Sequence, residues 1–216
     1  MARKKSAKPH YAMRRTWKNA LVLAFFLFIA LAAVVDRTYL RPVRQTVRLA
    51  VWASDDRKRY HEQSFAVVEV IDGDTLDIAA TDGDKPVTRI RLIGVDTPET
   101  KHPTIGKMYY GPEATDFSKQ QAEGKTVTVL LDAVSNERDR YGRLLAYVVL
   151  PDGKTLNEEL IRQGYGYADL RFNHSRFDLF AALMDVAIEQ KTGLWQQVTR
   201  NQLPQWLARS RPALLR

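Results

Sequence analysis

Two aspartates flank a glycine directly after the apolar run FAVVEVI, in the sequence Asp72-Gly73-Asp74. The plainer interpretation is a hairpin turn, because Asp and Gly favour tight turns after strands. A single turn rarely needs both acids, however, and neighbouring carboxylates repel one another unless a cation lies between them. The pair is therefore a candidate cation-binding site.

A second polar cluster, Asp96-Thr97-Pro98-Glu99, follows the run VTRIRLIGV. Pro98 stiffens this loop, which reduces the entropy lost when the neighbouring side chains are fixed. Asp96 and Asp74 could supply carboxylate oxygens to a hard cation, with backbone carbonyls and water completing about six to eight positions. The alternative is a polar loop in which Asp96 and Thr97 make local turns.

Basic side chains bracket a Tyr-Gly step in the third cluster, Glu137-Arg138-Asp139-Arg140-Tyr141-Gly142-Arg143. Arg143 begins an apolar run and could project toward a neighbouring site, although a solvated charged loop is the plainer interpretation. Phosphodiester hydrolysis needs a cation to polarise the phosphoryl oxygen, a base to orient water, and guanidinium groups to hold the phosphate. The three clusters, together with Arg91 in the preceding strand run, offer each of these parts.

Five short β-branched runs, separated by Asp-Gly steps and other turn signals, indicate the strands that must position these clusters. One helix begins with proline in its first turn, a second begins with a capping-box pattern, and a third is amphipathic. In chain order, the predicted strands and helices cover residues 65–71, 75–80, 87–95, 111–124, 125–131, 143–150, 155–164 and 175–191. This order predicts an α+β fold, a five-stranded OB-type β-barrel with three helices.

The net charge of +8 is concentrated at the ends of the chain. Residues 1–18 carry seven Lys or Arg and no acid, residues 36–63 carry a net +3, and residues 200–216 carry four Arg and no acid. Residues 64–199 therefore carry a net −6, so overall basicity does not indicate nucleic-acid binding by this domain. We expect a basic linker over 36–63 and a basic C-terminal tail over 200–216. The chain has no cysteine, which excludes disulfides and cysteine-ligated metals.

An uncharged run of 17 residues, 19–35, follows the basic arm of residues 1–18. Its length is at the short end for a transmembrane helix in the lipid bilayer, and a small-x-small step ending at Ala32 would also allow cleavage as a signal peptide. The excess of positive charge before the run places residues 1–18 in the cytoplasm. Both interpretations export the rest of the chain, either membrane-anchored or, if residues 1–32 are cleaved, secreted.

Six motifs in this order resemble the staphylococcal nuclease (thermonuclease) family: IDGDT, RLIGVDTPETKHP, YGPEA, DRYGRLLAY, NEELIRQG and GLW. The similarity covers about residues 64–196. It implies an OB barrel with three helices that hydrolyses DNA and RNA with Ca²⁺ and leaves 3′-phosphate ends. No protein partner is indicated, and we expect the nuclease domain to be monomeric.

The resemblance also implies how the carboxylates are used. Asp74 and Asp96 would be calcium ligands, and the carbonyl of Thr97 would be a third. Asp72 would support the metal site, through water, and Glu99 would orient or deprotonate the attacking water.

The basic residues would bind phosphate. By the same resemblance, Arg91 and Arg143 would clamp the scissile phosphate, while Arg140 and Tyr141 would hold the neighbouring one. One departure concerns a tyrosine that packs against a base in the family's type member, because Leu170 stands at the aligned position. Two nearby aromatic residues are candidates to replace it, Tyr167 and Phe172.

Two other functions compete with an active nuclease. One is an OB module that has lost catalysis and holds nucleic acid or a protein partner. The other is a structural membrane protein whose exported domain scaffolds an envelope complex. The intact set of charged residues argues against the first, because loss of catalysis should leave gaps among them. The second predicts no metal dependence.

Overall fold

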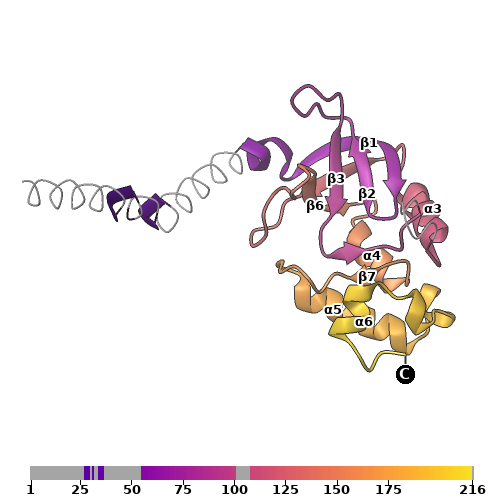
Figure 1. Cartoon of the computed structure of the whole chain (residues 1–216). Helices are drawn as coiled ribbons and strands as arrows, with labels where there is room; N and C mark the ends of the chain where they lie inside the picture. Colours follow the sequence, from indigo (N-terminus) through magenta and orange to yellow (C-terminus); the bar gives the residue numbers. More distant parts are fainter. Residues whose placement is uncertain (1–26, 30, 32–33, 37–54, 101–107, 216) are drawn as a thin grey trace, which may run out of the picture. The chain divides into compact units, whose positions relative to one another are not determined.

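The computed structural model describes residues 27–29, 31, 34–36, 55–100 and 108–215 (Figure 1). The chain forms two units, Met1–Trp52 and Ala53–Arg216. Most of the run 19–35, predicted as an anchor or signal peptide, lies outside the described residues. Within the described part, no helix has both the length and the hydrophobicity needed to cross a membrane.

Five strands close into a barrel in the order β1-β2-β3-β6-β5, which confirms the predicted five-stranded barrel. Strands β3 and β6 pair in parallel, and the other neighbours are antiparallel. The strand bounds are Gln63–Asp72 for β1, Thr75–Ile78 for β2, Thr88–Leu92 for β3, Thr126–Leu130 for β5 and Leu144–Val149 for β6.

In strand β3, side chains alternate between the inside and the outside of the barrel. Ile90 and Leu92 are buried in the core, whereas Arg89 and Arg91 alternate with them on the outer face, as the two-residue period of a strand requires. Leu144 in β6 pairs with Ile90 and is also buried. The residue just before it, Arg143, therefore reaches the same outer face as the two β3 arginines.

The third predicted strand does not run on to Val95, because the chain turns at Gly94 with φ +75°. A Cβ at Gly94 would lie 2.5 Å from ring atoms of His174, so this turn has room only for glycine. Beyond it, β4 (Val95–Asp96) pairs with β7 (Tyr167–Ala168) in a two-stranded sheet. This small sheet was not predicted, and it brings Asp96 beside the segment that follows β7.

The three predicted helices are present as α3 (Gly111–Ala122), α4 (Leu156–Arg162) and α5 (Phe177–Glu189). Figure 1 shows α3 at the side of the barrel and α5 at the end where β7 lies. Three short elements follow, bounded by Gly193–Gln196 for η2, Arg200–Gln202 for η3 and Gln205–Ser210 for α6.

Parts of the expected linker and tail are built into the domain. Residues 55–60 are helical, and the buried Tyr60 shares a 2.9 Å hydrogen bond with Thr88 of β3. At the other end, Leu203 and Leu207 join the core. The folded unit is therefore wider at both ends than residues 64–199.

Candidate active site

The β1–β2 turn is tied to the loop after β4. Asp74 Oδ2 accepts hydrogen bonds from the Thr97 backbone N (2.8 Å) and from Thr97 Oγ1 (3.1 Å). A Cβ at Gly73 would come within 2.6 Å of Thr97 Oγ1, so only glycine allows this approach. Asp72 belongs to the same turn, where its Oδ1 accepts a 3.2 Å bond from the Asp74 backbone N.

Arg91 lies between two of the predicted metal ligands. Its Nη1 forms an ion pair with Asp74, and its Nη2 donates a 2.8 Å hydrogen bond to Asp96 Oδ1. Only 14% of the side chain is exposed. Both terminal nitrogens of Arg91 are thus paired with carboxylates. A guanidinium fork of this kind can also pair with two phosphate oxygens.

The pKa of Arg91 reflects this crowding. Burial lowers it, but the carboxylates of Asp74, Asp96 and Asp72 outweigh burial, so the net pKa lies above the ordinary value. Arg91 therefore keeps its charge.

The carboxylates carry more negative charge than the neighbouring arginines neutralise. Burial and the charge of Asp74 raise the pKa of Asp72 to about 7. Burial also raises the pKa of Asp96, against the opposing effect of Arg91 and Arg171. A bound cation would stabilise the ionised form of both groups, which gives this end of the site a physical reason to bind one.

The donors present suit a hard cation. Asp74 and Asp96 offer carboxylate oxygens, and the cluster has no His or Cys side chain, a set that favours Ca²⁺ or Mg²⁺ over Zn²⁺. Across the described ranges, no group of three or more His, Cys, Asp or Glu side chains is arranged to hold a metal. The Thr97 carbonyl and water would therefore have to complete the coordination.

Glu99 is exposed beside this cluster. Its carbonyl accepts a 2.9 Å bond from the Met108 backbone N, and Gly111 packs closely against the same oxygen. The backbone of Glu99 is therefore fixed near the start of α3. In the part of the chain that the structure describes, its carboxylate makes no hydrogen bond or ion pair.

Arg143 is held from its own loop. Asp139 Oδ2 accepts a 2.7 Å bond from Arg143 Nε, and Asp139 Oδ1 accepts the backbone N–H groups of Tyr141 and Arg143. Arg140 stacks 4.7 Å from the centre of the Tyr141 ring and donates to its hydroxyl at 2.6 Å. The Tyr141 side chain is 66% exposed.

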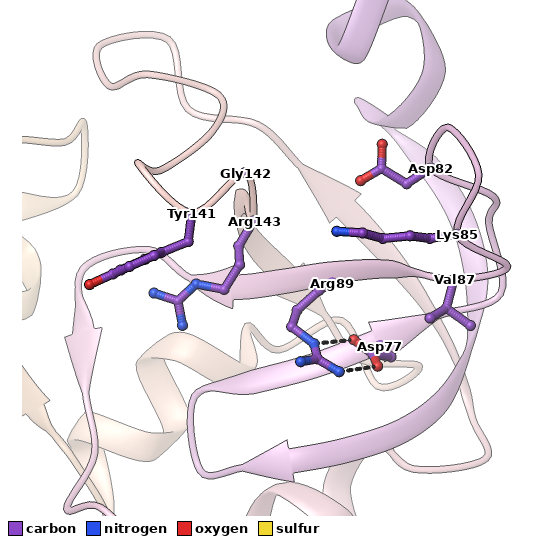
Figure 2. Close-up of a pocket in the computed structure, with 8 residues that line it drawn as sticks. All are labelled: Asp77, Asp82, Lys85, Val87, Arg89, Tyr141, Gly142 and Arg143. Atoms are coloured by element: carbon purple, nitrogen blue, oxygen red, sulfur yellow. Dashed lines mark hydrogen bonds and ion pairs between the residues drawn. The ribbon is translucent and has the colours of Figure 1, made fainter. Parts of the chain in front are cut away.

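A pocket of about 410 Å³ opens beside this loop (Figure 2). Arg89 faces it from β3, Arg143 faces it from the loop just before β6, and Lys85 extends into it from the β2–β3 connection. Arg89 is held by two 2.8 Å bonds to Asp77. The pocket is lined by Asp77, Asp82, Lys85, Val87, Arg89, Tyr141, Gly142 and Arg143.

The structure separates the two candidates for the base-packing role. Tyr167 is 1% exposed and lies edge-on to Trp195 in the core, so it cannot stack on a base. Phe172 is 65% exposed, with the Arg171 guanidinium 5.5 Å from its ring centre. Leu170 is partly buried against the core. Of the two candidates, only Phe172 is accessible.

Sequence reasoning missed two residues that contact Asp96. Arg171 Nη2 lies 3.3 Å from Asp96 Oδ1, and Trp206 Nε1 donates a 2.8 Å hydrogen bond to Asp96 Oδ2. Arg171 follows the unpredicted strand β7, and Trp206 lies in the segment interpreted as a tail. The only available signal was a lone tryptophan in a basic segment.

Comparison with known proteins agrees with this architecture. Residues 89–197 match the family model described as Staphylococcal nuclease homologue. An uncharacterised endonuclease of Escherichia coli is 38% identical over 145 residues, covering 67% of this chain and 84% of the relative. The thermonuclease of Staphylococcus hyicus is 39% identical over 137 residues, covering 62% of this chain and 77% of that relative.

A third relative, from Methanocaldococcus jannaschii, is 30% identical over 207 residues, covering 84% of this chain and 96% of its own length. The closed five-stranded barrel and the match to this family model together define a nuclease of the OB-barrel class. The chain belongs to the staphylococcal nuclease homologue family.

Proposed function

We propose that this protein is a calcium-dependent phosphodiesterase that hydrolyses DNA and RNA and leaves 3′-phosphate ends. The observation that carries the proposal is the convergence of Asp74 and Asp96 on the buried guanidinium of Arg91. Carboxylate oxygens for a hard cation and a guanidinium for a phosphate oxygen thus lie side by side. Bound there, calcium would polarise the phosphoryl oxygen.

The protein's own residues supply the remaining chemistry. Glu99 orients a water and takes its proton as the water oxygen bonds to phosphorus. The bond from phosphorus to the 5′-oxygen breaks, and that oxygen takes a proton from solvent. Arg91 and Arg143 hold the non-bridging oxygens and stabilise the charge that develops on them. Arg140 and Tyr141 bind the adjacent phosphate.

Two substitutions test these roles in the full chain. Glu99→Gln should lose about 10²–10⁴-fold in turnover, because general base catalysis contributes that much. Arg143→Ala should also lose turnover, through lost charge stabilisation. Glu113→Gln, an exposed acid in the first turn of α3, is the matched control for Glu99.

Plasmid cleavage with calcium is the readout, and the end groups of the products are analysed. Wild-type rates in both variants would contradict the assignment of roles. Tight binding of DNA without cleavage by the wild-type protein would favour the inactive binding module instead.

We also propose that residues 19–35 anchor the protein in the lipid bilayer, with the nuclease domain exported and monomeric. The uncharged run after a basic arm supports this topology. The protein should fractionate with membranes, and its domain should be cut by protease added outside the inner membrane. A soluble exported form starting near Ala33 would instead favour signal-peptide cleavage.

A further inference from the structure

The C-terminal segment, residues 199–215, reaches the proposed metal site although it lies beyond the matched residues 89–197. Figure 1 shows α6 close to β7 and α5. Leu207 of α6 is fully buried, and Leu203 just before α6 is 6% exposed. The segment also closes on itself, because Arg200 Nη1 donates to the carbonyl of Leu214 at 3.0 Å. Trp206 is therefore presented from a packed element.

The carboxylate of Asp96 receives donors from three elements. Arg91 from β3 and Arg171 from the segment after β7 reach Oδ1, and Trp206 from α6 donates to Oδ2. A carboxylate has about four lone-pair positions, so about one remains for another ligand. These contacts hold Asp96 in one orientation.

The Trp206 ring has a second contact through its face. The Arg171 guanidinium lies 4.7 Å from the ring centre, and the same guanidinium makes two 2.8 Å bonds to Asp169. The tryptophan thus supplies a hydrogen bond to Asp96 through its edge and a cation–π contact to Arg171 through its face. Both contacts converge on Asp96.

We propose that Trp206 is a positioning residue of the active site, which holds Asp96 in the orientation that the metal ion requires. This inference rests on the proposed function, because it assigns Trp206 to the same calcium site. Groups that hydrogen-bond to metal-ligating carboxylates orient them, and losing such a group typically costs about 10–100-fold in metal affinity or activity.

Trp206→Phe separates the hydrogen bond from the packing. Phenylalanine keeps an apolar ring and a face for Arg171 but removes the N–H donor. The matched control is Trp195→Phe, since the buried Trp195 Nε1 has no hydrogen-bond partner among the described residues. Both variants shrink a tryptophan ring, and only the first removes a bond to Asp96.

The measurement is calorimetric titration of the full chain, solubilised in detergent, with calcium alone, followed by plasmid cleavage over a range of calcium concentrations. Trp206→Phe should bind calcium about 10–100-fold more weakly, and its cleavage rate should recover in part at high calcium. Trp195→Phe should bind calcium like the wild type. Equal calcium affinity in the wild type and Trp206→Phe would overturn this inference but not the proposed function.

A wild-type protein that neither binds calcium nor cleaves DNA would overturn the inference and the proposed function together. If Trp206→Phe fails to fold, Arg171→Lys is the second variant, because it keeps the charge but loses the planar group that stacks on Trp206. It should also weaken calcium binding, by less than tenfold. Unchanged affinity in Arg171→Lys would then count against the inference.

Discussion

The two ends of the candidate site differ in how their side chains are held. At the carboxylate end, Arg91 of β3 pairs with Asp74 and Asp96, and these carboxylates also contact donors from the loop after β4, the segment after β7 and α6. At the arginine–tyrosine loop, residues 139–143, the contacts of Tyr141 and Arg143 stay within the loop.

This difference separates preorganised from adaptable parts of the site. A charged group fixed by buried bonds from several elements costs little reorganisation during reaction. In the proposed mechanism, Arg143 would exchange Asp139 for a phosphate oxygen, and the exposed Tyr141 would be ordered by the substrate. Changes at the carboxylate end should therefore lower turnover, and changes at the loop, Arg143 excepted, should mainly weaken binding.

The largest effect is expected for Arg91→Lys. Lysine cannot span two carboxylates and a phosphate with one planar fork, so kcat should fall by about 10²–10³-fold. Arg89→Lys is the matched comparison, because Arg89 lies on the same strand and outer face but pairs with Asp77. Steady-state cleavage kinetics should show at most a few-fold change in KM for Arg89→Lys. Similar losses in both variants would remove the distinction between the two ends.

Gly94→Ala should disturb the turn that carries Asp96. The new Cβ would meet His174 at 2.5 Å and Phe180 at 2.8 Å, at a φ of +75°, so we expect a loss of about 2–3 kcal/mol in the free energy of unfolding. Gly83→Ala has a similar φ of +59° with no atom within 4 Å, and should lose only about 1–2 kcal/mol. Urea unfolding measures both. Equal losses would show that the contact with His174 does not constrain this turn.

Asp72 should make the calcium-free protein less stable as pH rises. Its pKa is raised from 3.8 to about 7 in the folded state, so its stabilising contribution is present below about pH 4 and is lost as pH rises through 7. Asp72→Asn removes this titration. With chelator present, the unfolding free energy of the wild type should therefore fall relative to that of the variant as pH rises from 5 to 8. A constant difference across that range would mean that Asp72 titrates normally.

The smallest effect is expected for Arg140→Ala in the exposed loop. Loss of one phosphate contact should raise KM, keep kcat within about twofold, and reduce the salt slope of DNA binding by about 1. Arg162→Ala is the control, because Arg162 pairs with Glu159 on α4. A large fall in kcat for Arg140→Ala would place the loop among the preorganised groups.

Local patterns predicted most of the barrel and much of the site. Alternating apolar residues and Asp-Gly steps placed all five barrel strands, and proline and glycine marked helix α3. The carboxylates of Asp72, Asp74 and Asp96 lie at or just after strand ends, where side chains from neighbouring strands come together. Signals of this kind lie within a few residues of the groups that they position.

Contacts between distant segments were not predictable in this way. Strands β4 and β7 are two residues each, too short to show a period. Trp206 is 110 residues from Asp96 in the chain, so nothing near it marks the contact. Even the capping box expected at Thr155 and Glu158 is replaced, because Arg176 donates to both side chains.

The calcium dependence of plasmid cleavage by the full chain tests the central claim most directly. Because Asp74 and Asp96 offer only oxygen donors beside Arg91, cleavage should appear at about millimolar calcium, the affinity range of many extracellular calcium sites, and should stop when a chelator is added. Full activity in excess EDTA would contradict the proposed mechanism.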